Sequence, residues 1–172
     1  DPSLTGPSAA PRVLNALRDV DLALRLARPT QGDMLVRKLG DVAYALYASP
    51  TYIARFGRVP VSGDLTGHQI VGFSPEDRPL GPVWWLSRAE RQGHVVMRAS
   101  SAAVRLGAVQ AGEALAALPC FEADHIAALE RVVGPDLIGG LELLLLTRPD
   151  LAQLRHVRAV MDFLIAEVKA RA

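Results

Sequence analysis

The segment from residue 36 to residue 49, VRKLGDVAYALYAS, constrains the fold of this 172-residue chain more than any other segment. It is rich in valine, leucine and tyrosine, which are residue types that favour β-strands. Both sets of alternating positions in its second half are apolar: Ala43, Ala45 and Tyr47 form one set, and Tyr44, Leu46 and Ala48 form the other. Because successive strand residues point to opposite faces, we predict a strand inside a sheet that is covered on both sides.

Strand-like and helix-like segments alternate along the rest of the chain, which is typical of an α/β fold with a parallel or mixed sheet. The further predicted strands are residues 21–27, 69–73, 114–118 and 141–147, and a hairpin is predicted from residues 84–86 and 95–99 around the polar turn 87–93.

Short local signals mark the predicted helices. Ser49 and Pro50 predict a helix start, because proline at the first helical position loses no useful hydrogen bond and serine caps from in front. From Leu151 to Val168, apolar residues recur at spacings of three and four, which predicts an amphipathic helix with Asp150 as its N-cap. The other predicted helices are residues 12–18 and a helix of small residues that follows Ser100 and Ser101 and ends near Gly112.

The composition excludes several classes of protein. Lysine and arginine number 19 and aspartate and glutamate 18, so a net charge of +1 gives no field that would attract nucleic acid to this segment. The single cysteine, Cys120, excludes an internal disulfide framework and fits a reducing cytoplasm. The apolar run 143–146 is far shorter than a membrane span, and no basic and then apolar leader opens the chain. We therefore expect a soluble intracellular protein.

The sequence lacks the spacing of a metal site. The four histidines are scattered, without a histidine at the fourth position along or a cysteine pair to complete a zinc site: His68, His94, His125 and His156. Glu122, Asp124 and His125 form a small acidic cluster, which we interpret as a solvated loop.

Motifs of nucleophilic catalysis and phosphate binding are missing as well. The segment around Gly72 and Ser74 lacks the second glycine of a nucleophile elbow. The glycine pair at residues 139–140 precedes a strand, whereas a phosphate-binding loop follows one. We therefore expect no enzyme activity, no metal and no cofactor.

A series of short segments occurs in a defined order: Asp21-Leu-Ala-Leu-Arg25, then Leu39-Gly40, then Tyr47-Ala-Ser-Pro50 and Tyr52, then Asp64-Leu65 before Gly67-His68, and finally the predicted helix and strand from Gly107 to Pro119. In this order and spacing, the segments resemble the effector-binding domain of LysR-type transcriptional regulators. None of them is a catalytic fingerprint.

The resemblance implies an α/β fold similar to that of type II periplasmic binding proteins, in which two Rossmann-like lobes are joined by two crossing strands. The crossing strands would be the one that ends at Tyr47 and the one that begins at Leu141. Lobe I would comprise residues 1–47 and 145–172, and lobe II residues 48–144.

Members of this family open the domain with a strand, a loop and a long helix. Residues 1–10 are too short and too rich in proline, glycine and serine to supply these elements. Lobe I is therefore expected to be incomplete at its N-terminal side, and the winged helix-turn-helix that reads DNA is expected to lie in a separate N-terminal domain outside this sequence.

In such two-lobed domains the carboxyl ends of strands and the amino ends of helices face the ligand, which favours anions. The resemblance therefore implies that a small carboxylate-bearing effector binds in the cleft between the lobes. The expected contacts from lobe II are Phe73, Ser74, Ser100, Ser101, Pro119, Cys120 and Phe121, and those from lobe I are Arg25 and Thr147.

Six of the nine expected contacts have a structural alternative. Ser100 and Ser101 are equally explained as a helix cap. Phe73 and Phe121 are alternatively ordinary core residues, Cys120 a small buried apolar residue and Arg25 half of an ion pair.

The resemblance thus predicts a ligand-sensing domain that controls transcription through DNA binding. The parent protein is expected to be a cytoplasmic homodimer or homotetramer without a membrane partner. The alternative is a periplasmic-type solute-binding protein of a transport system, which has the same two lobes. A helix-turn-helix before residue 1 favours the regulator, and an export leader favours the transport protein.

Overall fold

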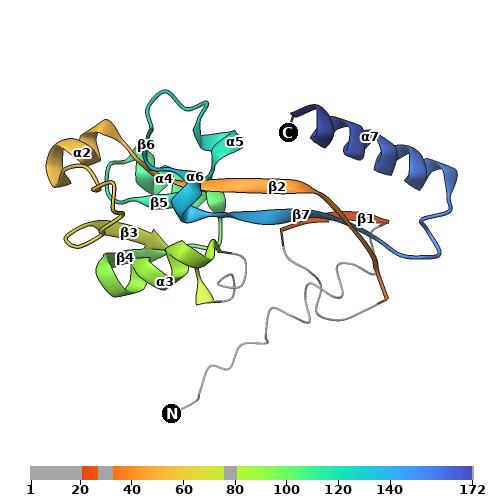
Figure 1. Cartoon of the computed structure of the whole chain (residues 1–172), viewed down its shortest axis with the longest axis horizontal. Coiled ribbons are helices and arrows are strands. Elements are labelled where there is room, and N and C mark those ends of the chain that lie inside the picture. The colour runs from red at the N-terminus through yellow and green to blue at the C-terminus, as the bar shows by residue number, and fades with distance from the viewer. Residues whose placement is uncertain (1–20, 27–32, 76–80, 172) are drawn as a thin grey trace, which may run out of the picture. The chain divides into compact units, whose positions relative to one another are not determined.

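The computed structural model describes residues 21–26, 33–75 and 81–171 of the chain (Figure 1). The predicted helix at residues 12–18 lies outside these ranges. The described elements are β1 (Leu22–Arg25), β2 (Leu35–Ala48), α2 (Pro50–Phe56), β3 (Gln69–Gly72), α3 (Val83–Gln92), β4 (His94–Arg98), α4 (Ala102–Gln110), β5 (Ala116–Pro119), α5 (Cys120–Ala123), β6 (Glu130–Val133), α6 (Pro135–Ile138), β7 (Gly140–Thr147) and α7 (Arg155–Arg171).

The chain divides into two compact units. Unit 1 contains the described residues up to Gly40 and from Glu142 onward, and unit 2 contains Asp41–Leu141. The chain therefore passes from unit 1 to unit 2 inside β2 and returns inside β7. The predicted lobe boundaries, at residues 47–48 and 144–145, fall inside the same two strands and stay a prediction.

From Tyr44 to Ala48, strand β2 is covered on both faces within unit 2, as its two apolar sets predict, whereas Ala43 is exposed. Tyr44, Leu46 and Ala48 belong to one buried cluster, together with residues of α2, α3 and β3. Ala45 and Tyr47 belong to a second buried cluster, which includes residues of α4 and β5. Full burial of one such large apolar side chain stabilises a fold by about 1.5–3 kcal/mol, so this strand anchors unit 2.

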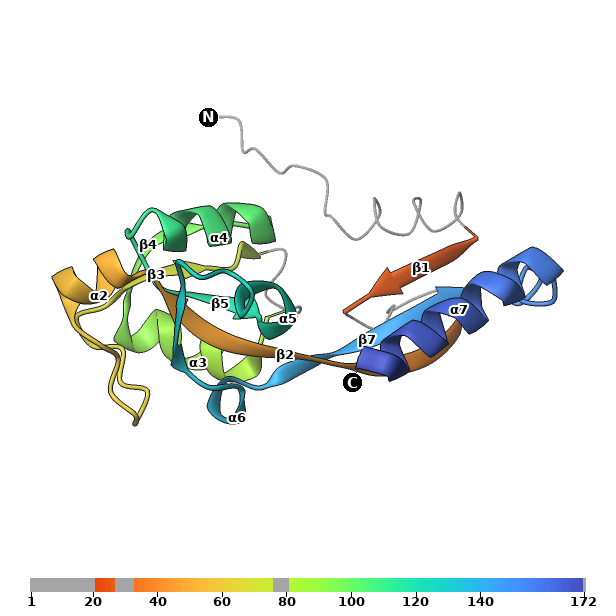
Figure 2. The ribbon, with the colours of Figure 1, turned by 90° about the horizontal axis from the view of Figure 1, so that it is seen from above.

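In unit 2 the carboxyl ends of several strands lie at the same edge. Strand β2 pairs antiparallel with β5 and with β6. Strand β3 pairs parallel with β4, and Ile70 of β3 forms a parallel bridge to Leu115, just before β5. Strands β3, β4 and β5 therefore run in the same direction, and their carboxyl ends lie at the same edge, with α3 and α4 on opposite sides of them (Figure 2).

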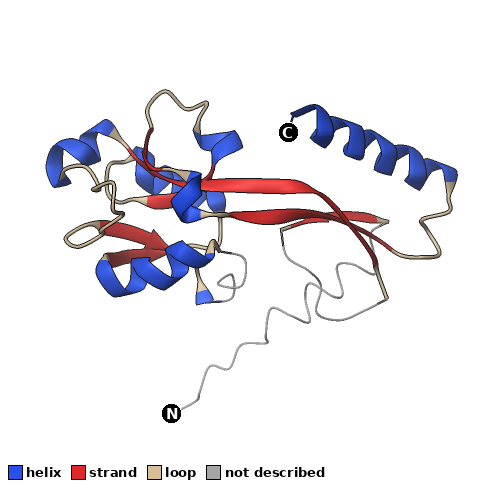
Figure 3. Cartoon of the chain, viewed as in Figure 1, coloured by secondary structure: helices blue, strands red, loops and turns tan. Residues whose placement is uncertain are grey.

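The predicted hairpin at residues 84–86 and 95–99 is wrong. Residues 83–92 form the helix α3, and β4 pairs parallel with β3 (Figure 3). The adjacent apolar residues at 84–86 fit a strand, but Trp85 and Ala89, four residues apart, are both buried, which is the spacing of a helix face.

Local capping signals predict the start of one helix and not of another. The Ser49 side chain accepts a hydrogen bond from the Tyr52 N–H at 3.2 Å, which confirms the predicted start of α2. The predicted N-cap at Asp150 is wrong, because α7 begins at Arg155. The Asp150 carboxylate instead accepts hydrogen bonds from the guanidinium of Arg148.

Unit 1 consists of β1, the first part of β2, most of β7 and α7. Strands β1 and β7 pair antiparallel, with Leu22 opposite Thr147 and Arg25 opposite Leu144. Helix α7 buries Val157 and approaches β2 closely, since a Cβ added at Gly40 would lie 3.3 Å from Val168. Within the described ranges, no helix has the length and apolar character needed to cross a membrane.

Candidate functional site

Four of the residues predicted to contact an effector lie at the carboxyl ends of the parallel strands of unit 2. Phe73 follows β3, Ser100 follows β4 by two residues, Pro119 ends β5 and Cys120 starts α5. Because β3, β4 and β5 run in the same direction, the structure brings these residues to one edge.

A buried arginine that the sequence analysis missed joins two of these strand ends. Arg105 lies on α4 with 4% of its surface exposed. Its Nη1 donates to the backbone oxygens of Ala99 at 2.9 Å and Ser100 at 3.1 Å. Its guanidinium carbon lies 4.2 Å from the centre of the Phe73 ring, a cation–π contact. Arg105 therefore fixes the end of β4 against the end of β3.

A second arginine contacts the same strand end. Arg98, the last residue of β4, donates from Nη1 to the backbone oxygen of Phe73 at 3.4 Å. Ser74, the next residue, is half-buried. Two guanidinium groups thus lie at Phe73, which favours an anion at this edge of unit 2.

Tyr44 is another residue of this edge that the sequence analysis did not select. It lies on β2 directly opposite Pro119, and only 3% of its surface is exposed. Burial raises the pKa of the Tyr44 hydroxyl, the nearby positive charge of Arg105 lowers it, and the negative charge of Glu122 raises it. No hydrogen bond joins this hydroxyl to any other residue that the structure describes.

Tyr47, on the other face of β2, has a full set of partners. Its hydroxyl donates to Asp124 Oδ1 at 2.6 Å, and Asp124 also pairs with Arg131. Burial and the hydrogen bonds to Asp124 and Cys120 raise the pKa of Tyr47, while the hydrogen bonds from Arg131 and Tyr47 lower the pKa of Asp124. Asp124 is therefore a structural ion-pair partner.

The remaining predicted contacts of unit 2 have different surroundings. Ser101 is the N-cap residue of α4, but its side chain makes no capping hydrogen bond. Phe73 is 4% exposed and belongs to a buried cluster, whereas Phe121 is 67% exposed. Cys120 is half-buried against the second cluster. The core interpretation therefore fits Phe73 and does not fit Phe121.

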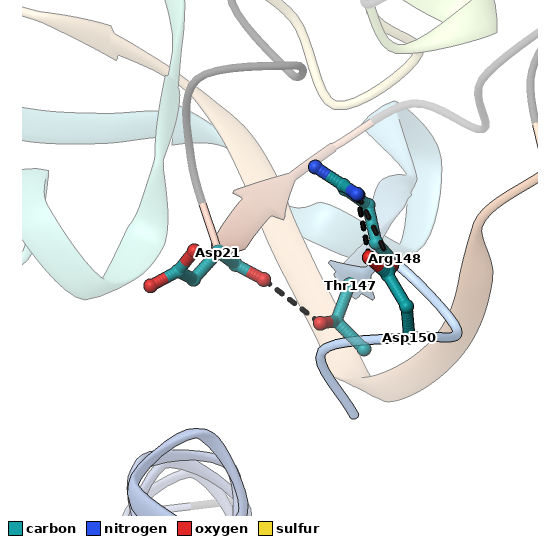
Figure 4. A network of polar contacts seen from close by, with 4 residues as sticks. All are labelled: Asp21, Thr147, Arg148 and Asp150. Carbon is teal, nitrogen blue, oxygen red and sulfur yellow. Dashed lines mark hydrogen bonds and ion pairs between the residues drawn. The ribbon is translucent and has the colours of Figure 1, made fainter. Parts of the chain in front are cut away.

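The two predicted contacts of unit 1 are not brought together. Arg25 and Thr147 lie three positions apart along the β1–β7 ladder, which is about 10 Å. Thr147 is 1% exposed, and its Oγ1 donates to the backbone oxygen of Asp21 at 2.8 Å (Figure 4). Thr147 therefore holds the start of β1.

In the described part of the chain, no three histidine, cysteine, aspartate or glutamate side chains gather in a way that could hold a metal ion.

Arg105 had a sequence signal that could have found it. It lies four residues before Val109, so helical spacing places a charge on the face that Val109 buries. Tyr44 had no such signal, because its alternation with Leu46 and Ala48 predicts a core residue.

The comparisons of sequence support the predicted family. The chain matches the model of the LysR substrate binding domain over residues 6–169. The HTH-type transcriptional regulator CrgA of Neisseria meningitidis is 37% identical over 57 residues, which are 33% of this chain and 19% of that protein. The aligned segment thus spans about a fifth of the length of this curated relative.

Solved structures agree with the fold. The regulatory domain of Neisseria meningitidis CrgA superposes with a TM-score of 0.71 at 24% identity, over 88% of this chain and 76% of that chain. The regulatory domain of Synechocystis PCC6803 CcmR, solved in complex with 2-PG, superposes with a TM-score of 0.69 at 12% identity, over 92% of this chain and 79% of that chain. These likenesses confirm the predicted α/β fold of the type II periplasmic-binding-protein kind.

Proposed function

Because this chain belongs to the family of LysR substrate-binding domains, we propose that it is the part of a LysR-type transcriptional regulator that senses a small effector. The family match over residues 6–169 is the observation that carries this proposal. The relatives with a stated role are transcriptional regulators and not transport proteins, which favours the regulator over a solute-binding protein of a transport system.

The proposed effector is a small anion that binds at the carboxyl-end edge of unit 2. The arginines at Phe73 and the amino end of α4 favour negative charge there. Hydroxyl groups of Ser100 and Ser101 are exposed and are suited to orient a carboxylate. The further proposed contacts are Phe73, Ser74, Pro119, Cys120 and Phe121, with Arg25 and Thr147 as the predicted contribution of unit 1.

Effector binding would act by favouring one arrangement of the regulator over another, since a ligand shifts an equilibrium only by its differential affinity for two states. The parent protein would pass this change to a separate DNA-binding domain, as a cytoplasmic homodimer or homotetramer without enzyme activity. These properties of the whole protein extend the role of relatives such as CrgA.

A calorimetric screen of small carboxylates, phosphates and their neutral analogues tests the proposal on this chain. We expect an anion to bind saturably, and Ser100→Ala or Ser101→Ala to weaken its binding by about tenfold, the effect of one hydrogen bond to a charged group. Ser62→Ala, at an exposed loop position, is the matched control and should leave the affinity unchanged. Equal affinities for all variants would remove the serines from the site.

The regulatory role has its own test in the full-length parent. The anion found in the screen should change the affinity of the parent for its promoter DNA, and DNA should change the affinity for the anion by the same factor. A promoter affinity that is identical with and without the bound anion would contradict the role as a sensor.

A further inference from the structure

The three tyrosines of the chain differ in how their hydroxyl groups are satisfied. Tyr47 donates to Asp124 at 2.6 Å. The Tyr52 hydroxyl lies 3.1 Å from His68 Nδ1 and accepts a hydrogen bond from the Gln69 N–H at 3.0 Å. Tyr44 is 3% exposed, and no hydrogen bond joins its hydroxyl to another residue in the described ranges, yet this oxygen is not among the buried polar atoms that lack a partner. The Tyr44 ring is therefore buried while its hydroxyl stays accessible, so this hydroxyl is free to donate a hydrogen bond to a bound molecule.

The surroundings of Tyr44 indicate which kind of partner would fit. It shares a buried cluster with Phe73 and lies opposite Pro119, so it is placed at the strand-end edge of unit 2. Burial has the largest effect on the Tyr44 hydroxyl and raises its pKa, so the group stays a protonated donor, while the nearby positive charge of Arg105 lowers the pKa by more than the exposed Glu122 raises it. A tyrosine hydroxyl donates one hydrogen bond, and a neighbouring cation strengthens the hold on an anionic acceptor.

We propose that the Tyr44 hydroxyl is the donor that recognises the anionic group of the effector, and that Arg105 is the positioning residue beside it. This inference rests on the proposed function and names the chemistry of its site. The ligand class is an oxyanion, such as a carboxylate, whose oxygen accepts from Tyr44 Oη.

Arg105 acts by keeping the neighbouring strand ends in place. Its hydrogen bonds to the Ala99 and Ser100 oxygens and its contact with the Phe73 ring fix the ends of β4 and β3 on either side of the site. Its fixed charge next to Tyr44 makes the position selective for anions over neutral molecules of the same shape.

NMR of the chain labelled with ¹³C at the tyrosine Cζ atoms tests this directly. The three resonances are assigned with Tyr→Phe variants and followed during titration with acetate, with acetamide as the neutral probe of similar size and sodium chloride as the ionic-strength control. We expect acetate alone to move the Tyr44 resonance, in a saturable way, and to leave the Tyr47 and Tyr52 resonances in place. A Tyr44 resonance that does not move, or that moves equally with acetamide, overturns the inference.

Two pairs of variants separate recognition from stability. Tyr44→Phe should weaken acetate binding by about tenfold, since it removes one hydrogen bond to a charged group, while the midpoint of thermal unfolding stays unchanged. Tyr47→Phe should leave the acetate affinity unchanged and lower the midpoint of thermal unfolding, because the Tyr47 hydroxyl is hydrogen-bonded to Asp124. Arg105→Lys should retain part of the shift that acetate causes in the Tyr44 resonance, and Arg105→Gln should abolish this shift. Acetate affinity that is equal in Tyr44→Phe and the native chain overturns the inference.

The amide resonances of Ser100 and Ser101 distinguish failure of this inference from failure of the proposed site. If acetate moves these amides and not Tyr44, the proposed site stands and the role of Tyr44 falls. If acetate moves neither, the inference falls, and the screen of effectors described above decides the proposed function.

Discussion

His68 is a buried imidazole whose polar contacts lie within unit 2. It is 5% exposed, and its Nδ1 lies 3.1 Å from the hydroxyl of Tyr52, a residue of α2. Tyr52 in turn stacks on Phe56, with ring centres 4.7 Å apart. Burial lowers the pKa of His68, and the negative charge of Asp64 raises it by a smaller amount. The neutral imidazole is therefore the form that the fold accommodates.

This burial predicts a loss of stability in mild acid. The pKa of His68 is lower in the folded state than in the unfolded chain, so below about pH 6.5 the unfolded state binds more protons and unfolding is favoured. We expect the free energy of unfolding in urea to fall between about pH 7 and about pH 5.5. His68→Gln should reduce this dependence, whereas His94→Gln, at an exposed position, should retain it. Equal pH profiles for the two variants would contradict the prediction.

At the scale of elements, the loop between α2 and β3 packs against two helices through a glycine. Gly63 has a φ of +72°, a conformation that side chains rarely adopt. A Cβ added there would lie 2.7 Å from Trp84 of α3 and 2.9 Å from Leu137 of α6. Gly67, in the same loop, has a similar φ of +80° but nothing within 4 Å of an added Cβ. The two glycines thus differ in packing and not in backbone conformation.

Alanine at these two positions separates backbone strain from overpacking. Gly67→Ala should destabilise the chain by about 1–2 kcal/mol, the cost of a side chain in the left-handed region. Gly63→Ala should cost about 1–3 kcal/mol more, because Trp84 and Leu137 must move. Urea unfolding of the two variants measures the difference. Equal destabilisation would mean that the loop does not pack on α3 and α6 as described.

At the scale of the whole molecule, the two units have cores of very different size. Both large buried clusters belong to unit 2. In the described part of unit 1, the buried apolar residues are Leu144, Leu145, Leu146 and Val157. Several large apolar side chains of unit 1 are exposed instead: Leu24, Leu35, Val36, Leu154, Val160 and Phe163. Because burial of apolar surface supplies most of the stability, unit 1 should be the weaker unit.

Hydrogen exchange followed by mass spectrometry checks this difference on the intact chain. Amides of β1 and α7 should exchange faster than those of β3 and β5, because opening unit 1 exposes less apolar surface. Tyr47→Phe, which weakens unit 2, should reduce the difference in exchange rate between the amides of β1 and α7 and those of β3 and β5. Equal protection of all four elements would show that the chain unfolds as a single cooperative body.

The sequence by itself determined the features that depend on near neighbours in the chain. The two apolar sets of β2 predicted burial on both faces, and Ser49 with Pro50 predicted the start of α2. The order of short motifs predicted the family and its fold. For the strand and the helix start the physical cause is local, because strand alternation and helix capping act over a few residues.

Tertiary structure decided what depends on residues far apart in the chain. The apolar residues at 84–86 fit a strand or a helix, and packing of Trp85 and Ala89 into the core of unit 2 selected the helix. The residue numbers of Arg105 and Tyr44 differ by 61, and only the fold places Arg105 against the Phe73 ring and Tyr44 in the same buried cluster as Phe73. Such proximity follows from strand order and not from sequence spacing, so no local pattern could have predicted it.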